Sequence, residues 1–199
     1  MSLDAHATAL AESLAKANLV PGPAAGLIAA GFRATTKLDV RFGGKAVELG
    51  TFFRAGECKV APTVSFAAEA ETDGASAASY TYTFILTDPD APTPDDPKFA
   101  FWRHWVLSGL RPQGVDAAAA SWELTAYLGP GPKDDSKPHR YLFLLYREPE
   151  GGLSLSKDDV GGEEFVQRRS FRPAEFAERH GLRLVGVNWM LCAGDGWKE

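Results

Sequence analysis

Short stretches suited to β-strands follow one another through most of the chain, with few helical segments between them. The strongest is 80–87 (YTYTFILT), in which aromatic and β-branched residues suit a pleated, half-buried surface. Further strands are expected at 37–42, 63–69, 104–108, 122–128, 140–146 and 184–191. Because so little chain separates these strands, the sequence favours an antiparallel β-rich core over a parallel α/β sheet.

A helix is expected before the first strand. Within residues 4–17, Leu10 and Leu14 fall on one helical stripe. Asp4 can cap the start of this helix, and Asn18 can end it. The helix therefore presents one apolar face to the β-rich core.

Three other segments lie outside the predicted strands. The small apolar residues at 23–31 indicate a packed connector, and the Gly- and Asp-rich residues at 149–164 indicate a surface excursion. A second helix is expected at 173–180, with Pro173 at its first position and Gly181 just past its end.

The length of 199 residues is enough for one domain with a hydrophobic core and short for two. We therefore expect a single domain over residues 1–199, with 1–22 as an N-terminal helical segment. The expected fold is mainly β, with a sandwich-like antiparallel core, peripheral helices and a C-terminal helix-strand region.

The net charge is −5 and the isoelectric point is about 5.4. Nucleic-acid binding needs a positive surface that displaces counterions, so this balance argues against it. It also disfavours a strong electrostatic hold on anionic membranes. A site for an anion must therefore be local, built from a few groups.

Other features indicate a cytoplasmic protein. The first 20 residues lack the basic flank and apolar block of a signal peptide, and no apolar run is long enough to span a bilayer. Cys58 and Cys192 are expected on two separate strand segments as reduced thiols. We expect a monomer.

Polar side chains gather at two loops stiffened by proline. The first, 88–94 (DPDAPTP), follows the strongest predicted strand and precedes His104. The second, 129–132 (GPGP), leads to His139 at the start of another strand. Proline fixes φ, so these loops have fewer conformations to lose on binding.

Two imidazoles, two carboxylates and bare glycine amides could together hold one small anion. An imidazole beside an Asp has one ring nitrogen held by the carboxylate, which leaves the other nitrogen for a ligand. Each feature also has a purely structural explanation. An Asp-Pro-Asp run is usually a turn, a lone His is more often a satisfied core group, and Pro-Gly-Pro is simply a loop. The residues by themselves support both explanations equally.

At these residues the sequence resembles the phosphatidylethanolamine-binding protein family. Its first hallmark is an apolar strand followed by Asp-Pro-Asp-x-Pro and a His at a fixed distance, matched by 84–92 and His104. Its second is Gly-x-Gly-Pro followed by His-Arg-Tyr, matched by 129–132 and 139–141. The resemblance covers about residues 80–192, and the N-terminal helix resembles the fungal branch, which includes carboxypeptidase Y inhibitors.

The resemblance implies a non-enzymatic protein without a cofactor. Its ligand would be a phosphate-containing small molecule or a phospholipid headgroup, and its protein partner a serine carboxypeptidase or a member of a kinase cascade. It also implies a cis peptide at Ala91–Pro92. The implied ligand-binding residues are Asp88, Asp90, Pro92, Trp102, His104, Gly131, Pro132, His139 and Tyr141.

Three departures from the family pattern predict altered selectivity. Phe99 stands where many members have Tyr, which removes a hydroxyl. Arg103 stands where a second His is common, and we expect it to add positive charge near the pocket mouth. Lys133 replaces a second proline, so the rim is expected to be looser and more basic.

A metal-dependent hydrolase is the main alternative, because the Asp and His side chains of the two loops have the chemistry of metal ligands. The sequence lacks a closely spaced ligand pair such as His-x-x-x-His. No serine lies in a Gly-x-Ser-x-Gly motif, so we reject nucleophilic catalysis of that type.

Overall fold

The computed structural model describes residues 2–69, 80–112 and 122–199. These residues form two β-sheets and two α-helices. The large sheet has the order β3 (Thr51–Arg54), β9 (Arg183–Ala193), β8 (His139–Arg147), β5 (Tyr82–Asp88), β6 (Trp102–Leu110) and β7 (Trp122–Thr125). The small sheet has the order β2 (Lys45–Ala46), β1 (Leu38–Phe42) and β4 (Thr63–Phe66).

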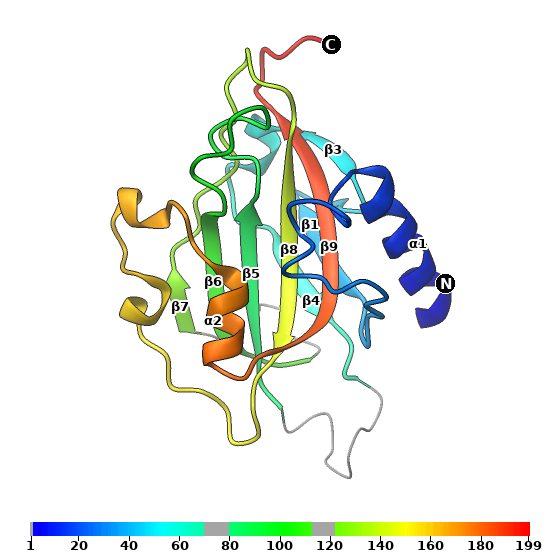
Figure 1. Ribbon diagram of the computed structural model, residues 1–199, viewed down its shortest axis with the longest axis vertical. Coiled ribbons are helices and arrows are strands. Elements are labelled where there is room, and N and C mark those ends of the chain that lie inside the picture. Colours follow the sequence, from blue (N-terminus) through cyan, green and yellow to red (C-terminus); the bar gives the residue numbers. More distant parts are fainter. Residues whose placement is uncertain (1, 70–79, 113–121) are drawn as a thin grey trace.

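The two sheets pack face to face, with the small sheet behind the large one in Figure 1. Aromatic side chains fill the space between them. The rings of Phe66 and Tyr82 have centroids 4.8 Å apart, and those of Phe42 and Phe143 are 6.4 Å apart. The predicted sandwich-like, mainly β fold is confirmed.

Helices and connectors cover the other face of the large sheet. The helix α1 (Leu3–Lys16) buries Leu10 and Leu14, and Ile28 of the following connector joins the same cluster. The second helix, α2 (Pro173–Arg179), lies in front of β5 and β6 in Figure 1. Both faces of the central strand β5 are thus buried, and every residue of β5 is buried.

Two short strands and one pairing were not predicted. The strands β2 and β3 have only two and four residues, too few for a clear alternation of apolar and polar residues. The strand β3 runs parallel to β9, which is the last strand in the chain. The expectation of an antiparallel core is therefore wrong for this pair, because it depends on a contact between distant parts of the sequence.

The ends of α1 also differ from the expectation. Ser2 is the N-cap, and its hydroxyl accepts a hydrogen bond from the backbone N–H of Ala5 at 3.3 Å. Asp4 lies in the first turn, where its negative charge interacts favourably with the helix dipole. The C-cap is Ala17, and Asn18 follows with a left-handed φ of 51°. Within the described ranges, no helix has the length and apolar character needed to cross a membrane.

The two cysteines are buried free thiols. Cys192 lies on β9, as expected for a strand residue. Cys58 instead ends a 3-10 turn, η1 (Ala55–Cys58), because the chain turns sharply after β3. The prediction of reduced thiols is confirmed, and the placement of Cys58 on a strand is wrong.

The segment after β8 is more than a surface excursion. Its 3-10 turn η4 (Lys157–Val160) buries Val160 against the helical face of the large sheet. A second turn, η5 (Phe165–Arg168), buries Arg168. This segment therefore contributes to the packing beside β6.

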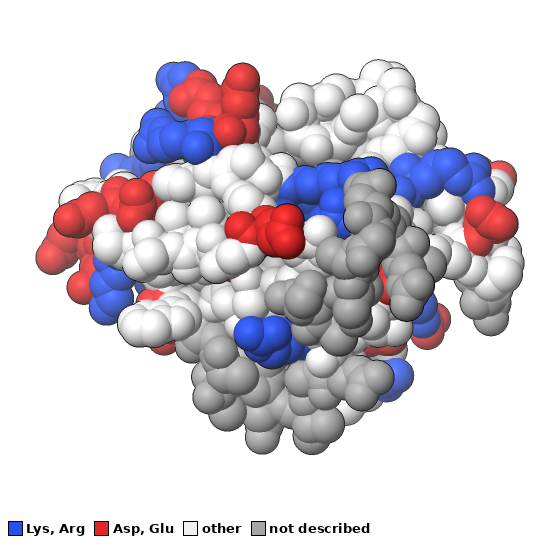
Figure 2. Space-filling view, turned by 90° about the horizontal axis from the view of Figure 1, so that it is seen from below, with Lys and Arg blue, Asp and Glu red and all other residues white. Residues whose placement is uncertain are grey.

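Charges of both signs share the surface. In Figure 2, Lys and Arg side chains lie in separate groups, and Asp and Glu side chains lie beside several of them. Two of the exposed ion pairs are Lys45–Glu57 at 2.9 Å and Lys137–Asp95 at 2.6 Å. Such pairs at exposed positions stabilise a fold by little.

Candidate ligand pocket

Strand alternation brings the ends of β5 and β8 to the same side of the large sheet. Phe84 and Leu86 on β5 face the core between the sheets, so Asp88, two residues later, points to the same side. Tyr141 on β8 also belongs to that core, and His139 precedes it by two residues. Asp88 and His139 therefore meet beside the core at one end of the sheet.

His104 reaches this side through a β-bulge in β6. Leu86 pairs with Trp105, whereas the next residue, Thr87, pairs with Arg103. His104 is thus one extra residue in β6, and a bulge of this kind redirects the neighbouring side chains. Regular alternation would not have placed His104 and Trp105 on the same side.

As a result of the bulge, the side chains of His104 and Arg103 lie on opposite sides of the large sheet. His104 lies against Tyr141, with ring centroids 5.2 Å apart. Arg103 lies on the helical face, where its guanidinium is 5.3 Å from the ring centroid of Phe171. The expectation that Arg103 adds charge at the pocket mouth is therefore wrong, because its side chain lies on the opposite side of the sheet.

Asp88 and His139 form a buried pair. Nδ1 of His139 is 2.8 Å from Oδ2 of Asp88, and the two side chains are 4% and 3% exposed. The backbone N–H of Asp90 donates to Oδ1 of Asp88 at 2.7 Å. Nε2 of His139 is 3.1 Å from the Ser136 hydroxyl. Both ring nitrogens of His139 have partners, so the expectation that one of them is left for a ligand is wrong for this residue.

His104 has one nitrogen available. Its Nδ1 lies 2.6 Å from the carbonyl oxygen of Leu128, which can only accept, so Nδ1 carries a proton. In the described part of the chain Nε2 has no hydrogen-bond partner, and the neutral ring offers a lone pair there. Burial lowers the pKa of His104, with Arg168 and His139 acting in the same direction against Asp88. His104 therefore favours its neutral form.

Asp90 is the one predicted ligand-binding residue that does not line the pocket. Its carboxylate accepts from Nε of Arg140 at 2.9 Å and from Nη2 at 2.5 Å. It also accepts from the backbone N–H of Arg140 at 2.8 Å. These bonds fix the loop after β5 to the start of β8. Asp90 therefore stabilises the loop that lines the pocket without lining the pocket itself.

The loops bring backbone close to the pocket. The Ala91–Pro92 peptide is cis, as the resemblance implies. At Gly129, an added Cβ would lie 2.5 Å from the carbonyl oxygen of Cys58, so only glycine fits there. Around Gly131 there is open space, and a ligand can approach its backbone.

These groups surround a cavity of about 370 Å³. Eight of the nine predicted residues line it, namely Asp88, Pro92, Trp102, His104, Gly131, Pro132, His139 and Tyr141. The two residues singled out as departures, Phe99 and Lys133, line it too. The remaining lining residues are Ala91, Leu128, Gly129, Phe165 and Arg169.

Two lining residues came from a part of the chain where sequence reasoning predicted no site. Phe165, which is 58% exposed, packs against Trp102 with ring centroids 5.0 Å apart. The Arg169 guanidinium lies 4.3 Å from the ring centroid of Phe99. Neither residue lies in a predicted strand or helix, and the tertiary fold brings their segment beside β6.

The metal-dependent hydrolase receives no support from this geometry. Asp88 is bonded to His139, and Asp90 is bonded to Arg140. Across residues 2–69, 80–112 and 122–199, His, Cys, Asp and Glu side chains form no group of three or more that could hold a metal ion.

Comparison with known proteins agrees with the fold. A family model described as phosphatidylethanolamine-binding protein matches residues 32–187. A solved structure of carboxypeptidase Y inhibitor, complexed with its cognate proteinase, has a TM-score of 0.73 and 23% identity, covering 95% of this chain and 97% of that chain. A phosphatidylethanolamine-binding protein from Plasmodium vivax has a TM-score of 0.70 and 21% identity, covering 93% and 97%.

A homologue structure from Plasmodium falciparum gives the same TM-score of 0.70 and 21% identity, covering 91% of this chain and 95% of that chain. At such identities these likenesses establish the fold. The family model matches well over half of the 199 residues. Together with the two loop motifs at one cavity, this match shows that the chain belongs to the phosphatidylethanolamine-binding protein family.

Proposed function

We propose that this chain is a non-enzymatic binding protein whose pocket holds a phosphate group. The observation that carries the proposal is the position of His104. This residue lines a cavity next to the Asp88–His139 pair, and its Nε2 has no hydrogen-bond partner among the described residues. A preformed cavity with a few convergent polar groups is typical of small-molecule sites.

The rim supplies positive charge for such a group. Lys133 and Arg169 both line the cavity, and each can donate to phosphate oxygens. His104 can accept a hydrogen bond from a protonated phosphate oxygen, or it can take up a proton and donate to the dianion. The negative charge of Asp88 opposes the ligand, but its hydrogen bond to His139 moderates this effect.

The walls of the pocket define what is attached to the phosphate. Trp102 and Phe165 form an aromatic side that can cover an apolar or cationic group. A cavity of about 370 Å³ accommodates a headgroup but not two acyl chains. The ligand class is therefore a phosphate monoester or a phospholipid headgroup rather than a whole membrane lipid.

Inhibition of a serine carboxypeptidase is a second function at the level of protein partners. The likeness to carboxypeptidase Y inhibitor over 95% of this chain favours it, because that protein was solved with its proteinase. The regulation of a kinase cascade remains a prediction of the family resemblance.

Calorimetric titration with orthophosphate and phosphoethanolamine tests ligand binding. We expect saturable binding at one site by the wild type, a loss of at least about tenfold in His104→Ala, and a smaller loss in Lys133→Gln. Lys59→Gln removes an exposed lysine outside the cavity and is the matched control. Equal affinities in all four proteins would refute the assignment of this pocket.

A separate assay tests the partner. Purified protein is added to carboxypeptidase Y at equimolar and tenfold ratios, and peptide hydrolysis is followed. Ala15→Arg places a large charge on the exposed face of α1 without touching the buried Leu10 and Leu14. Inhibition by the wild type that weakens in Ala15→Arg supports an interface on the N-terminal helix, whereas full peptidase activity at both ratios rules out this partner.

A further inference from the structure

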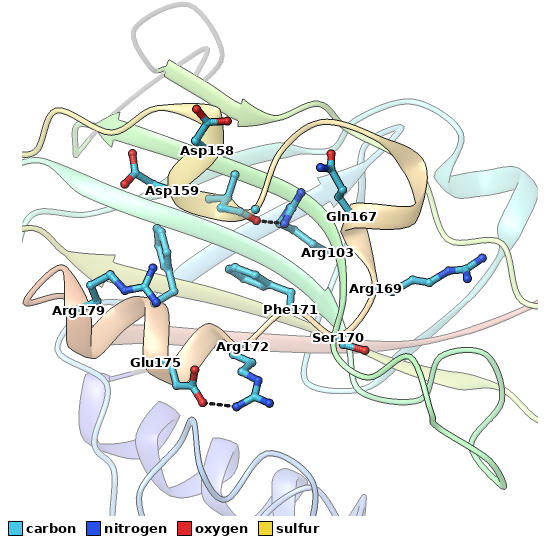
Figure 3. A pocket seen from close by; sticks show the side chains of 13 residues that line it. Arg103, Asp158, Asp159, Gln167, Arg169, Ser170, Phe171, Arg172, Glu175 and Arg179 are labelled. Carbon is cyan, nitrogen blue, oxygen red and sulfur yellow. Dashed lines mark hydrogen bonds and ion pairs between the residues drawn. The ribbon is translucent and has the colours of Figure 1, made fainter.

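A second cavity, of about 280 Å³, lies on the helical face of the large sheet. Figure 3 shows it around Phe171, with Arg103 from β6, Gln167 from η5 and Arg179 from α2. The Arg169 side chain extends away from Phe171 in this view, which fits its contact with the ring of Phe99 in the first pocket. Arg169 lines both cavities, so they adjoin at the segment that carries this residue.

Arg103 is a buried cationic residue in the lining of this cavity. The residue is 1% exposed, and its Nη1 and Nη2 donate to the carbonyl oxygens of Val160 and Gly162. Its Nε–H is buried and has no hydrogen-bond partner in the described part of the chain. None of the ion pairs formed by the described residues includes Arg103. Arg103 is thus a buried cation that has no ion-pair partner within residues 2–69, 80–112 and 122–199.

A second buried guanidinium lies beside it. Arg168 is 8% exposed and donates to the carbonyl oxygens of Arg103, His104 and Ala126. Burial and, to a smaller extent, the nearby Arg168 lower the pKa of Arg103 to about 10. Buried charges in proteins are normally paired, so Arg103 favours an anion close by, whereas the charge of Arg168 is partly balanced by Glu123.

Two of the three acidic side chains of the cavity already have partners, although the charge of Asp159 also acts on Arg179. Glu175 is 2.6 Å from Arg172. Asp159 accepts from the backbone N–H of Ser156 at 2.7 Å and from its hydroxyl at 2.8 Å. Asp158 remains as a carboxylate of the lining. The anion must therefore be small enough to reach Arg103 and Arg179 without lying against Asp158.

We propose that this cavity binds a phosphate group, either as orthophosphate or as a phosphate monoester, between Arg103 and Arg179. Guanidinium groups match the geometry of phosphate oxygens, and several donors can be satisfied by one phosphate. A bound anion would offset the buried positive charge of Arg103, and the amide of Gln167 adds a donor. A volume of about 280 Å³ suits a ligand of this size. This site does not depend on the function proposed for the first pocket.

NMR titration tests the proposal in His104→Ala, a variant in which the first pocket has lost its main contact. The Nε–Hε resonance of Arg103 and the side-chain amide of Gln167 are followed during titration with orthophosphate and, separately, with phosphoethanolamine. We expect both resonances to shift and saturate. A response to orthophosphate with a weaker response to phosphoethanolamine assigns the site to free phosphate, and the reverse order assigns it to monoesters.

Exposed positions provide variants that keep the fold. Arg179→Gln removes one proposed donor, and we expect it to weaken binding about fivefold to tenfold. Arg183→Gln removes an exposed arginine outside the cavity and is the matched control. Arg103→Gln should abolish binding at this site. If this variant does not fold, the Arg103 resonance of the protein that keeps Arg103 still tests the proposal. The proposal is refuted if the Arg103 resonance does not respond to either ligand, or if Arg179→Gln and Arg183→Gln bind equally.

Discussion

Arg140 joins Asp90 of the pocket loop to the N-terminal helix. Its Nε and Nη2 bind the Asp90 carboxylate at 2.9 and 2.5 Å, and its Nη1 donates to the carbonyl oxygens of Ala17 and Asn18 at 3.0 and 3.1 Å. The hydrogen bonds to Asp90 are the largest cause of the raised pKa of Arg140. One side chain therefore connects the loop after β5, the start of β8 and the end of α1.

Arg140→Gln should destabilise the fold by about 3 kcal/mol, because it leaves the buried Asp90 carboxylate without its partner. Urea denaturation measures this loss. The double variant Asp90→Asn/Arg140→Gln should recover part of it, since no unpaired charge remains. Equal stabilities of the single and double variants would contradict this role of the pair.

The affinity for a phosphate monoester should rise as pH falls from about 8 to about 6. Burial lowers the pKa of His104, so the free protein carries a neutral ring. A bound dianion favours the protonated ring, and binding therefore takes up a proton. Calorimetry in two buffers of different ionisation enthalpy measures that uptake. An affinity that does not change with pH would mean that neutral donors hold the ligand.

The same ring should make the fold sensitive to acid. The folded-state pKa of His104 lies below its ordinary value near 6.5, so the unfolded chain binds a proton more readily than the folded one. The stability from this difference is fully present above about pH 6.5 and is lost as pH falls toward the folded-state pKa. Denaturation at about pH 7.5 and 5 should show a larger loss in the wild type than in His104→Gln. Equal losses would contradict the burial of a neutral imidazole.

Phe165→Ala should weaken the binding of ligands with an apolar group several-fold and leave orthophosphate affinity unchanged. Phe165 packs on Trp102, yet it is 58% exposed, so the fold should keep its stability. Val166 is 60% exposed and lies outside the cavity, which makes Val166→Ala the matched control. Titration with a short-chain phosphoethanolamine ester compares the two. Equal affinities of Phe165→Ala and Val166→Ala for this ester would contradict a contact between Phe165 and the ligand.

Local sequence signals predicted the parts of the pocket that depend on short stretches of chain. The strand at 80–87, which corresponds to β5, follows from adjacent residues. The cis bond before Pro92 follows from the family resemblance. The convergence of His104 and His139 on one cavity also agrees with the order of the two motifs.

The remaining features depend on contacts between distant segments. The β-bulge at His104 arises from its pairing with β5, and it is this bulge that turns Arg103 to the other face. The partner of Asp90 is Arg140, 50 residues away, so the sequence did not distinguish a ligand-binding carboxylate from an ion-paired one. Phe165 and Arg169 join the pocket through the fold of η5 beside β6.

The central claim is that a phosphate group binds against Nε2 of His104. The most direct measurement is a long-range ¹H–¹⁵N NMR spectrum of the imidazole rings during titration with phosphoethanolamine at about pH 7. We expect a saturable shift of Nε2 of His104 toward the protonated value, while its Nδ1 stays bonded to Leu128. Saturable binding that leaves the His104 ring unchanged would contradict the claim.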